Sequence, residues 1–130
     1  MSERPLVLCA DDDEDILSLV ALRLERAGFE VEKVHDGDAA LDAARKRTPA
    51  VAVLDVMMPR RTGVEVLAEF RADPALAEVK VVLLSARVQE SDVEHGLGAG
   101  AHAYLAKPFK AQELVAAVER LLGRSDQVRR

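Results

Sequence analysis

The sequence predicts one α/β domain, built on a doubly wound parallel sheet of five strands with helices on both faces. Two observations predict this fold. Short apolar runs alternate along the chain with segments whose apolar residues recur at helical spacing. Most of the runs are apolar along their whole length, which is typical of strands buried on both sides in a parallel sheet. Right-handed crossovers between such strands give a doubly wound arrangement.

The first half of the chain predicts two strands and two helices in alternation. Residues 6–10 form a continuous apolar run. The next helix is expected to begin at Asp13, whose carboxylate suits an N-cap, and to end at Gly28. Residues 30–34 alternate in character and predict a short strand, and an Ala-rich helix follows over 37–47, stopping before a proline. The inward face of the first helix is expected to contain Ile16, Leu17, Val20, Ala21 and Leu24.

The second half continues the alternation. Residues 51–54 form an apolar strand, and 62–71 a helix; 79–84 form the next strand, 91–99 a helix, and 101–105 a short strand. The helix over 62–71 is expected to turn Val64, Leu67 and Ala68 inward. A last amphipathic helix is marked by Leu114, Val115, Val118, Leu121 and Leu122.

Composition limits the class of protein. The chain has 130 residues, of which 49% are hydrophobic and 3% aromatic, so one domain (1–123) with an aliphatic core is expected, followed by a tail or the start of a linker over 124–130. The net charge of -5 argues against nucleic-acid binding. Cys9 lies in an apolar run and is expected to be buried. No apolar stretch reaches the roughly 20 residues that span a bilayer, and a cytoplasmic protein without membrane contact is expected.

Charged and polar residues follow the predicted strands at the point where each ends. The carboxyl ends of parallel strands meet at one edge of the sheet, where such folds form their reactive crevice. The residues that this edge gathers are Asp11 and Asp12, Asp55, Ser85 and Lys107. Two carboxylates about 4 Å apart repel by about 4 kcal/mol at an effective dielectric of ~20, so a cation must lie among them. A hard divalent cation and an ammonium group are the natural candidates.

Each residue alone has a simpler explanation as a helix cap, a turn residue or a surface lysine, but those explanations would all have to hold at once. The functional interpretation is specific. Asp12 and Asp55 would supply oxygens to Mg²⁺, with Asp11 reaching it through water. Asp55 would attack a phosphoryl donor and form an aspartyl phosphate. Mg²⁺ and Lys107 would neutralise the developing charge, and Ser85 would donate a hydrogen bond to a phosphoryl oxygen.

The chain resembles response-regulator receiver domains, and in particular the chemotaxis response regulator family, from about Leu6 to Leu122. The matching segments are Leu8-Cys9-Ala10-Asp11-Asp12-Asp13, Leu54-Asp55-Val56-Met57-Met58-Pro59 with Gly63, Leu83-Leu84-Ser85-Ala86, and Tyr104-Leu105-Ala106-Lys107-Pro108-Phe109. The resemblance implies a flavodoxin-like strand order 2-1-3-4-5 and a phosphorelay switch. A sensor histidine kinase or histidine phosphotransfer protein would phosphorylate the domain, which would then control a partner protein or a fused output domain.

The resemblance also assigns roles residue by residue. Asp55 is implied as the phosphoacceptor. Asp11, Asp12, Asp55 and the backbone carbonyl of Met57 are implied as the Mg²⁺ ligands. Ser85 and Tyr104 are implied as the switch pair, in which a phosphoryl group draws the Ser85 hydroxyl inward and the Tyr104 ring turns from solvent to a buried position. The Lys107-Pro108 peptide bond is implied to be cis.

Other functions fit less well. A pseudo-receiver, which acts as a scaffold without accepting phosphate, is the leading alternative. The aspartate-based phosphatases place a second acid two residues after the nucleophile, where this chain has Met57. The glycines of 96–100 follow a helix, which is the wrong context for a dinucleotide fingerprint, and there is no P-loop. His35, His95 and His102 lack metal-ligand spacing and are expected at the surface.

The output face is expected around the helix from Ser91, the Tyr104 strand and the last helix. DNA-binding winged-helix relatives usually dimerise there through an acidic pair in the strand and basic residues on the helix. The matching positions here are His102, Ala103, Ala117 and Glu119. Because that ion-pair network cannot form, we expect a monomer, or a dimer built on other contacts, that signals to a partner protein.

Overall fold

The computed structural model describes residues 4–86 and 100–123, and these form a five-stranded parallel sheet in the order β2-β1-β3-β4-β5. The predicted fold class and strand order are therefore confirmed. The strands are β1 (Leu6–Ala10), β2 (Glu30–Val34), β3 (Val51–Asp55), β4 (Lys80–Ser85) and β5 (Ala103–Ala106). The helices are α1 (Glu14–Arg26), α2 (Gly37–Lys46), α3 (Gly63–Ala72) and α5 (Ala111–Leu121). The predicted helix over 91–99 and the tail 124–130 lie outside the described residues.

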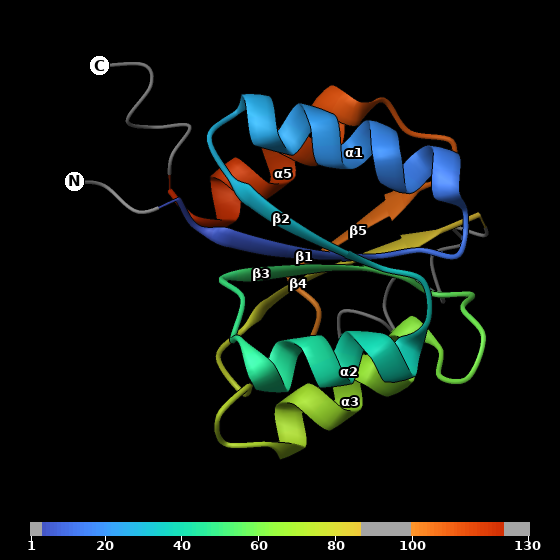
Figure 1. Cartoon of the computed structure of the whole chain (residues 1–130), viewed down its shortest axis with the longest axis vertical. Coiled ribbons are helices and arrows are strands. Elements are labelled where there is room, and N and C mark those ends of the chain that lie inside the picture. The colour runs from blue at the N-terminus through green and yellow to red at the C-terminus, as the bar shows by residue number, and fades with distance from the viewer. Residues whose placement is uncertain (1–3, 87–99, 124–130) are drawn as a thin grey trace.

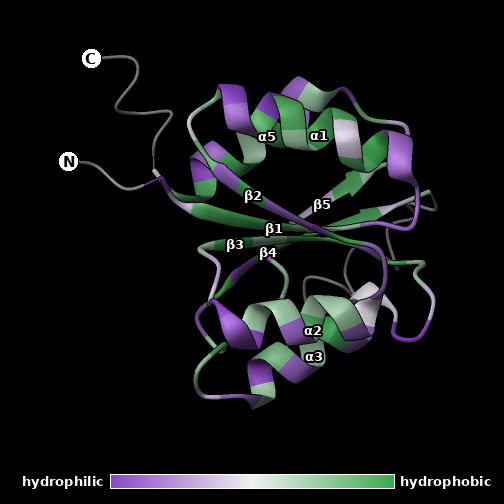
Figure 2. Cartoon of the chain, in the orientation of Figure 1, coloured by the Kyte–Doolittle hydropathy of each residue, from purple (hydrophilic) through white to green (hydrophobic). Residues whose placement is uncertain are grey.

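Helices cover both faces of the sheet (Figure 1). One face packs against α1 and α5, and the other against α2 and α3. Each face has its own apolar cluster: Leu24 and Leu114 belong to the first, Leu41 and Phe70 to the second. Every residue of β1 and β3 is buried, and these strands form the hydrophobic centre in Figure 2. The edge strand β2 keeps partly exposed residues, as its alternating sequence predicts.

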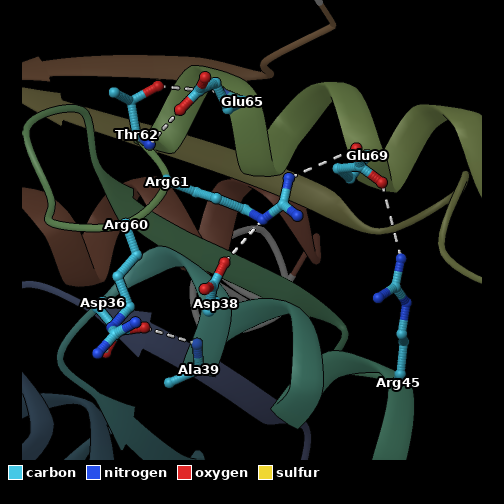
Figure 3. A network of polar contacts seen from close by, with 9 residues as sticks. All are labelled: Asp36, Asp38, Ala39, Arg45, Arg60, Arg61, Thr62, Glu65 and Glu69. Atoms are coloured by element: carbon cyan, nitrogen blue, oxygen red, sulfur yellow. Dashed lines mark hydrogen bonds and ion pairs between the residues drawn. The ribbon is translucent and has the colours of Figure 1, made fainter.

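Side-chain caps fix where the helices begin, immediately after the loops that leave the sheet. The carboxylate of Asp13 accepts from the backbone N–H groups of Asp15 and Ile16 at 3.0 and 3.2 Å. Asp36 caps α2 by accepting from Ala39 N–H at 2.7 Å. At α3, Thr62 and Glu65 bond each other's backbone N–H groups in a capping box (Figure 3). The predicted starts of α1 and α2 are thereby confirmed.

The inward face of α3 differs from the prediction. Val66, Leu67 and Phe70 are buried, whereas Ala68 is exposed and Val64 is half-buried. This helix has apolar residues on several sides, so its own sequence does not determine which side meets the sheet. The core is also less purely aliphatic than expected, because Phe29 and Phe70 are its largest fully buried side chains. Cys9 is buried, as predicted. Among the described residues, no helix is long and apolar enough to cross a membrane.

The loop between β3 and α3 contains one strained backbone position. Arg60 has a φ of 72°, in the left-handed region that residues with a Cβ atom rarely adopt. Its guanidinium Nε lies 3.8 Å from the Asp36 carboxylate, which is too far for a strong ion pair. The side chain therefore compensates for little of the backbone strain.

Replacing Arg60 with glycine should stabilise the protein. Relief of the left-handed conformation is worth about 1–2 kcal/mol, and the greater freedom of glycine in the unfolded chain offsets about 0.4–1 kcal/mol of it. We expect urea unfolding to show Arg60→Gly more stable than wild type by about 0.5–1 kcal/mol. Arg60→Ala removes the same side chain but keeps the Cβ atom, so it is the matched control and should not stabilise. Equal stabilisation by both variants would contradict the strain at this position.

Candidate functional site

Asp55 is the last residue of β3, and the packing around its backbone determines its position. The following residue, Val56, donates its N–H to the Leu84 carbonyl of β4 at 2.8 Å. A Cβ atom on Gly63 would lie 2.5 Å from the Asp55 carbonyl oxygen, so only glycine lets α3 begin this close to the strand end. The Asp55 side chain is buried and accepts from Met57 N–H at 3.2 Å. The sequence motif contained Gly63, but this steric role is visible only in the fold.

Asp11 is held beside Asp55 at the end of the neighbouring strand β1. Its backbone N–H bonds the Val34 carbonyl of β2 at 3.2 Å, which continues the sheet by one residue. Its side chain is buried, and one carboxylate oxygen, Oδ1, accepts from Asp13 N–H at 2.9 Å. Asp12, which follows, is exposed.

Lys107 supplies the positive charge between the two buried carboxylates. Its Nζ lies 3.0 Å from Asp11 Oδ2 and 3.2 Å from Asp55 Oδ2. The lysine backbone is fixed from β4, because its N–H donates to the Ser85 carbonyl at 2.8 Å. The Lys107-Pro108 peptide bond is cis, as predicted. The sequence-based expectation that Asp11, Asp55 and Lys107 meet at one edge is confirmed.

The carboxylate cluster keeps a negative excess that suits a divalent cation. Carboxylate oxygens of Asp11, Asp12 and Asp55 all lie within 4.8 Å of one another. Three carboxylates and the one ammonium group of Lys107 sum to a charge of −2. Asp11 Oδ2 is buried and has no hydrogen bond of suitable geometry to any described residue, although the Lys107 ammonium is near. The possible ligands are all carboxylate oxygens, and one of them has no hydrogen bond. Such a set fits Mg²⁺.

Burial and the crowding of charge both shift the pKa values of the site. Burial, and then the charge of Asp11, raise the pKa of Asp55 to about 6, against the opposing effects of Lys107 and the Met57 N–H. Partial burial alone would lower the pKa of Lys107. The close contact with Asp11 and the charges of both carboxylates outweigh this effect, so the pKa of Lys107 is raised. Lys107 therefore stays charged, while any further positive charge near Asp55 would stabilise its ionised carboxylate.

The remaining predicted site residues lie at or near the same edge. Ser85 is the buried last residue of β4, opposite Ala106 of β5. Tyr104 lies in β5 opposite Leu83, half-buried against the apolar cluster under α2 and α3. Met57 lies two residues after Asp55 in the loop; it is 69% exposed, and its backbone N–H donates to Asp55.

The two described histidines lie at the surface, as expected. His35 and His102 are exposed, and His95 lies outside the described residues. His35 Nε2 contacts the Glu14 carboxylate at 2.5 Å. His102 precedes β5 instead of belonging to it, and its ring Nδ1 accepts from Val81 N–H at 3.2 Å.

An apolar groove beside the site was not predicted. It has a volume of about 290 Å³, and it borders Lys107 and Pro108 on one side and α1 on the other. The residues that line it are Ile16, Leu19, Val20, Ala86, Lys107, Pro108 and Phe109. Leu19 and Leu22 of α1 are 51% and 45% exposed. Leu19, on the outer side of an otherwise polar helix face, is the sequence signal that indicates this groove, whereas Leu22 does not line it.

A comparison with protein families identifies the arrangement. The family model of the response regulator receiver domain matches residues 7–119. The chain belongs to this family. It is thus a receiver domain, a type of signalling domain found in two-component systems. Its acidic cluster of Asp11, Asp12 and Asp55 lies where such domains have their phosphorylation site.

Individual relatives agree with this assignment. The DNA-binding dual master transcriptional regulator RpaA of Synechocystis is 37% identical over 124 residues, which are 95% of this chain and 52% of RpaA. The chain spans about half the length of the curated relatives it matches. The crystal structure of a putative response regulator from Chloroflexus aurantiacus superposes with a TM-score of 0.87 at 34% identity, covering 94% of this chain and 100% of that one.

A further solved structure bears on the metal. The receiver domain of the sensor histidine kinase PA1611 from Pseudomonas aeruginosa has a TM-score of 0.84 and 29% identity, covering 93% of this chain and 99% of that one. That protein has a magnesium ion coordinated in its active site cleft. Receiver domains bind Mg²⁺ in the acidic pocket, and the corresponding cluster is formed here by Asp11, Asp12 and Asp55.

The raised pKa of Asp55 predicts a pH-dependent stability in metal-free buffer. Between pH 4 and 6 the folded protein keeps a proton on Asp55 that the unfolded chain has released, because the pKa rises from 3.8 to about 6 on folding. This stability is present below pH 4 and is lost as the pH rises through about 6. Asp55→Asn should remove the loss and be more stable than wild type at pH 7, by up to about 3 kcal/mol.

Urea unfolding with a chelator present, followed from pH 4 to 8, measures this difference. Asp42→Asn changes an exposed carboxylate on α2 and is the matched control. It should keep the wild-type slope. A wild-type curve parallel to that of Asp55→Asn across this range would show that Asp55 titrates as in the unfolded chain.

Proposed function

We propose that Asp55 accepts a phosphoryl group from a sensor histidine kinase or a histidine phosphotransfer protein. The observation that carries this proposal is the contact set of Lys107, whose Nζ lies 3.0 Å from Asp11 and 3.2 Å from Asp55. A buried carboxylate at a strand end, between an ammonium group and two further carboxylates, is placed to act as a nucleophile and not as a structural ion pair. A cytoplasmic location is part of this proposal, because such kinases donate their phosphoryl groups there.

The transfer step follows from the groups in the site. A carboxylate oxygen of Asp55 forms a bond to phosphorus while the bond from phosphorus to the donor nitrogen breaks, and the donor imidazole leaves. Lys107 keeps its charge and balances the negative charge that collects on the phosphoryl oxygens. Ser85 donates its hydroxyl to one of those oxygens. Bound Mg²⁺ supplies further charge neutralisation, and Asp11, Asp12, Asp55 and the Met57 carbonyl would hold it. In this way the domain assists its own phosphorylation.

The donor protein needs a surface beside Asp55. The apolar groove between α1 and Lys107, with the exposed side chain of Leu19 at its border, supports docking of a helix that presents the phosphorylated histidine. Apolar contacts would give affinity here without adding charge to the acidic site.

The output is proposed to run through Ser85 and Tyr104. A phosphoryl group that draws the Ser85 hydroxyl inward would open space for the Tyr104 ring, which is half-buried at the adjoining strand. The domain, residues 1–123, would then present its changed face to a partner protein or to an output domain fused after the tail. Direct DNA contact is not part of this proposal, given the net charge of -5.

Phosphorylation is tested by incubating the full chain with acetyl phosphate and Mg²⁺ and measuring its intact mass. One added phosphoryl group is expected, with acetate as the leaving group. Asp55→Asn should lose the label completely, and Asp12→Ala should lose most of it by weakening the metal site. Unchanged labelling of Asp55→Asn would refute the assignment. No labelling of wild type by acetyl phosphate or by a phosphorylated kinase would favour the alternative function, a phosphorylation-independent scaffold.

The switch is tested by a crystal structure with Mg²⁺ and beryllofluoride, which imitates the phosphoryl group on Asp55. The Ser85 hydroxyl is expected to move toward the beryllofluoride and the Tyr104 ring to become buried. Ser85→Ala should bind beryllofluoride but leave Tyr104 half-buried, which separates binding from switching. Finding both side chains in their present positions in the wild-type complex would contradict the proposal.

A further inference from the structure

The loop between β3 and α3 is seated directly on the first turn of α2. Gly37 N–H donates to the Pro59 carbonyl at 3.3 Å. A Cβ atom on Gly37 would lie 2.2 Å from the Arg61 carbonyl oxygen and 2.5 Å from the Arg61 Cβ atom. Because these are backbone and near-backbone atoms, any side chain at position 37 would force the loop away. The loop therefore occupies the space that a side chain at position 37 would need. We call this close contact of the loop with Gly37 the Gly37 seat.

Two successive arginines of the loop reach acidic residues at the start of α2 (Figure 3). Arg61 Nε donates to Asp38 Oδ1 at 2.7 Å, a short charge-assisted hydrogen bond. Arg60 Nε lies 3.8 Å from Asp36 Oδ2, while the other oxygen of Asp36 caps the helix. The Arg61 pair is thus the stronger of the two side-chain links between the loop and α2.

Arg61 and Arg45 both connect α2 with α3. Besides its bond to Asp38 of α2, Arg61 lies 3.6 Å from Glu69 of α3. Arg45, near the end of α2, contacts Glu69 at 3.7 Å and Asp73, just after α3, at 3.6 Å. Both arginines are about equally exposed, at 42% and 48%. Arg45 therefore resembles Arg61 in charge, exposure and bridging of α2 and α3, but it belongs to a helix and not to the loop.

The loop that Arg61 fastens begins beside the phosphoacceptor. Met57 N–H bonds Asp55 Oδ1 at 3.2 Å, and the Met57 carbonyl is a proposed Mg²⁺ ligand. The segment between Met57 and Arg61 is short and stiff. Pro59 has a fixed φ, and its carbonyl accepts from both Arg61 N–H, at 2.8 Å, and Gly37 N–H. We propose that Arg61, docked on Asp38 over the Gly37 seat, is a positioning residue that sets the affinity for Mg²⁺. This inference rests on the proposed function.

Charge and positioning predict opposite effects for Arg61→Gln. Removal of a positive charge near an acidic site should by itself tighten cation binding. Loss of the link to Asp38 should free the loop and weaken binding by roughly two- to fivefold, the range for one partly exposed charged hydrogen bond. We expect the weakening to exceed the charge effect. Arg45→Gln removes the same charge without releasing the loop, so its Mg²⁺ affinity should stay at or slightly above that of wild type.

Isothermal titration of the full chain with Mg²⁺ at one fixed, low salt concentration measures these affinities. The charge-reversed pair Asp38→Arg with Arg61→Asp should bind Mg²⁺ more tightly than Arg61→Asp alone, because it restores the link. Equal or tighter binding by Arg61→Gln than by Arg45→Gln would overturn the positioning role while leaving the proposed function intact. A wild-type chain that binds no Mg²⁺ would contradict both.

Discussion

The shared ion pair of Lys107 with Asp11 and Asp55 is the interaction on which the site depends. Carboxylates this close repel by several kcal/mol at the dielectric of a protein surface, and one ammonium group balances only part of that charge. The fold therefore holds a cluster that would separate if its residues were on mobile loops. Its excess charge of −2 makes the edge a receptor for positive charge, while burial, and then the charge of Asp11, raise the pKa of Asp55.

The sheet resists this repulsion because its central strands are buried on both sides. Asp11 and Asp55 directly follow or end β1 and β3, whose residues are buried throughout, so moving either carboxylate would disturb the packed centre of the sheet. Gly63 adds a second constraint, since it lets α3 begin against the Asp55 carbonyl. Separate contacts therefore hold the strand ends and the loop after Asp55, and those of Gly37 and Arg61 concern only the loop.

Features with a local cause could be predicted from the sequence. Apolar runs gave the strands, and Asp13 and Asp36 marked the starts of α1 and α2, because a cap depends on neighbouring residues. The gathering of Asp11, Asp55 and Lys107 was also predictable, since it follows from parallel topology. The face of α3 was not, because apolar residues also lie at its half-buried and exposed positions, Val64 and Ala68, and not only at the buried Val66. The start of β5 was placed too early, because the His102 ring, and not a backbone carbonyl, accepts from Val81 N–H. The seat of Arg61 on Gly37 joins distant residues and has no local signal.

Successive side chains of β5 point to opposite faces of the sheet, so this strand links the site at the sheet edge to both faces. Tyr104 packs against the cluster under α2 and α3, whereas Ala103 and Leu105 pack against the cluster under α1 and α5. Lys107 follows this strand, beside the groove on the α1 side, and also contacts both buried carboxylates. A change of charge on Asp55 therefore acts on a lysine whose backbone is continuous with Tyr104 and is bonded to Ser85. One strand thus carries side chains to both faces of the sheet, so the groove beside α1 and the apolar cluster around Tyr104 can both respond to the charge on Asp55.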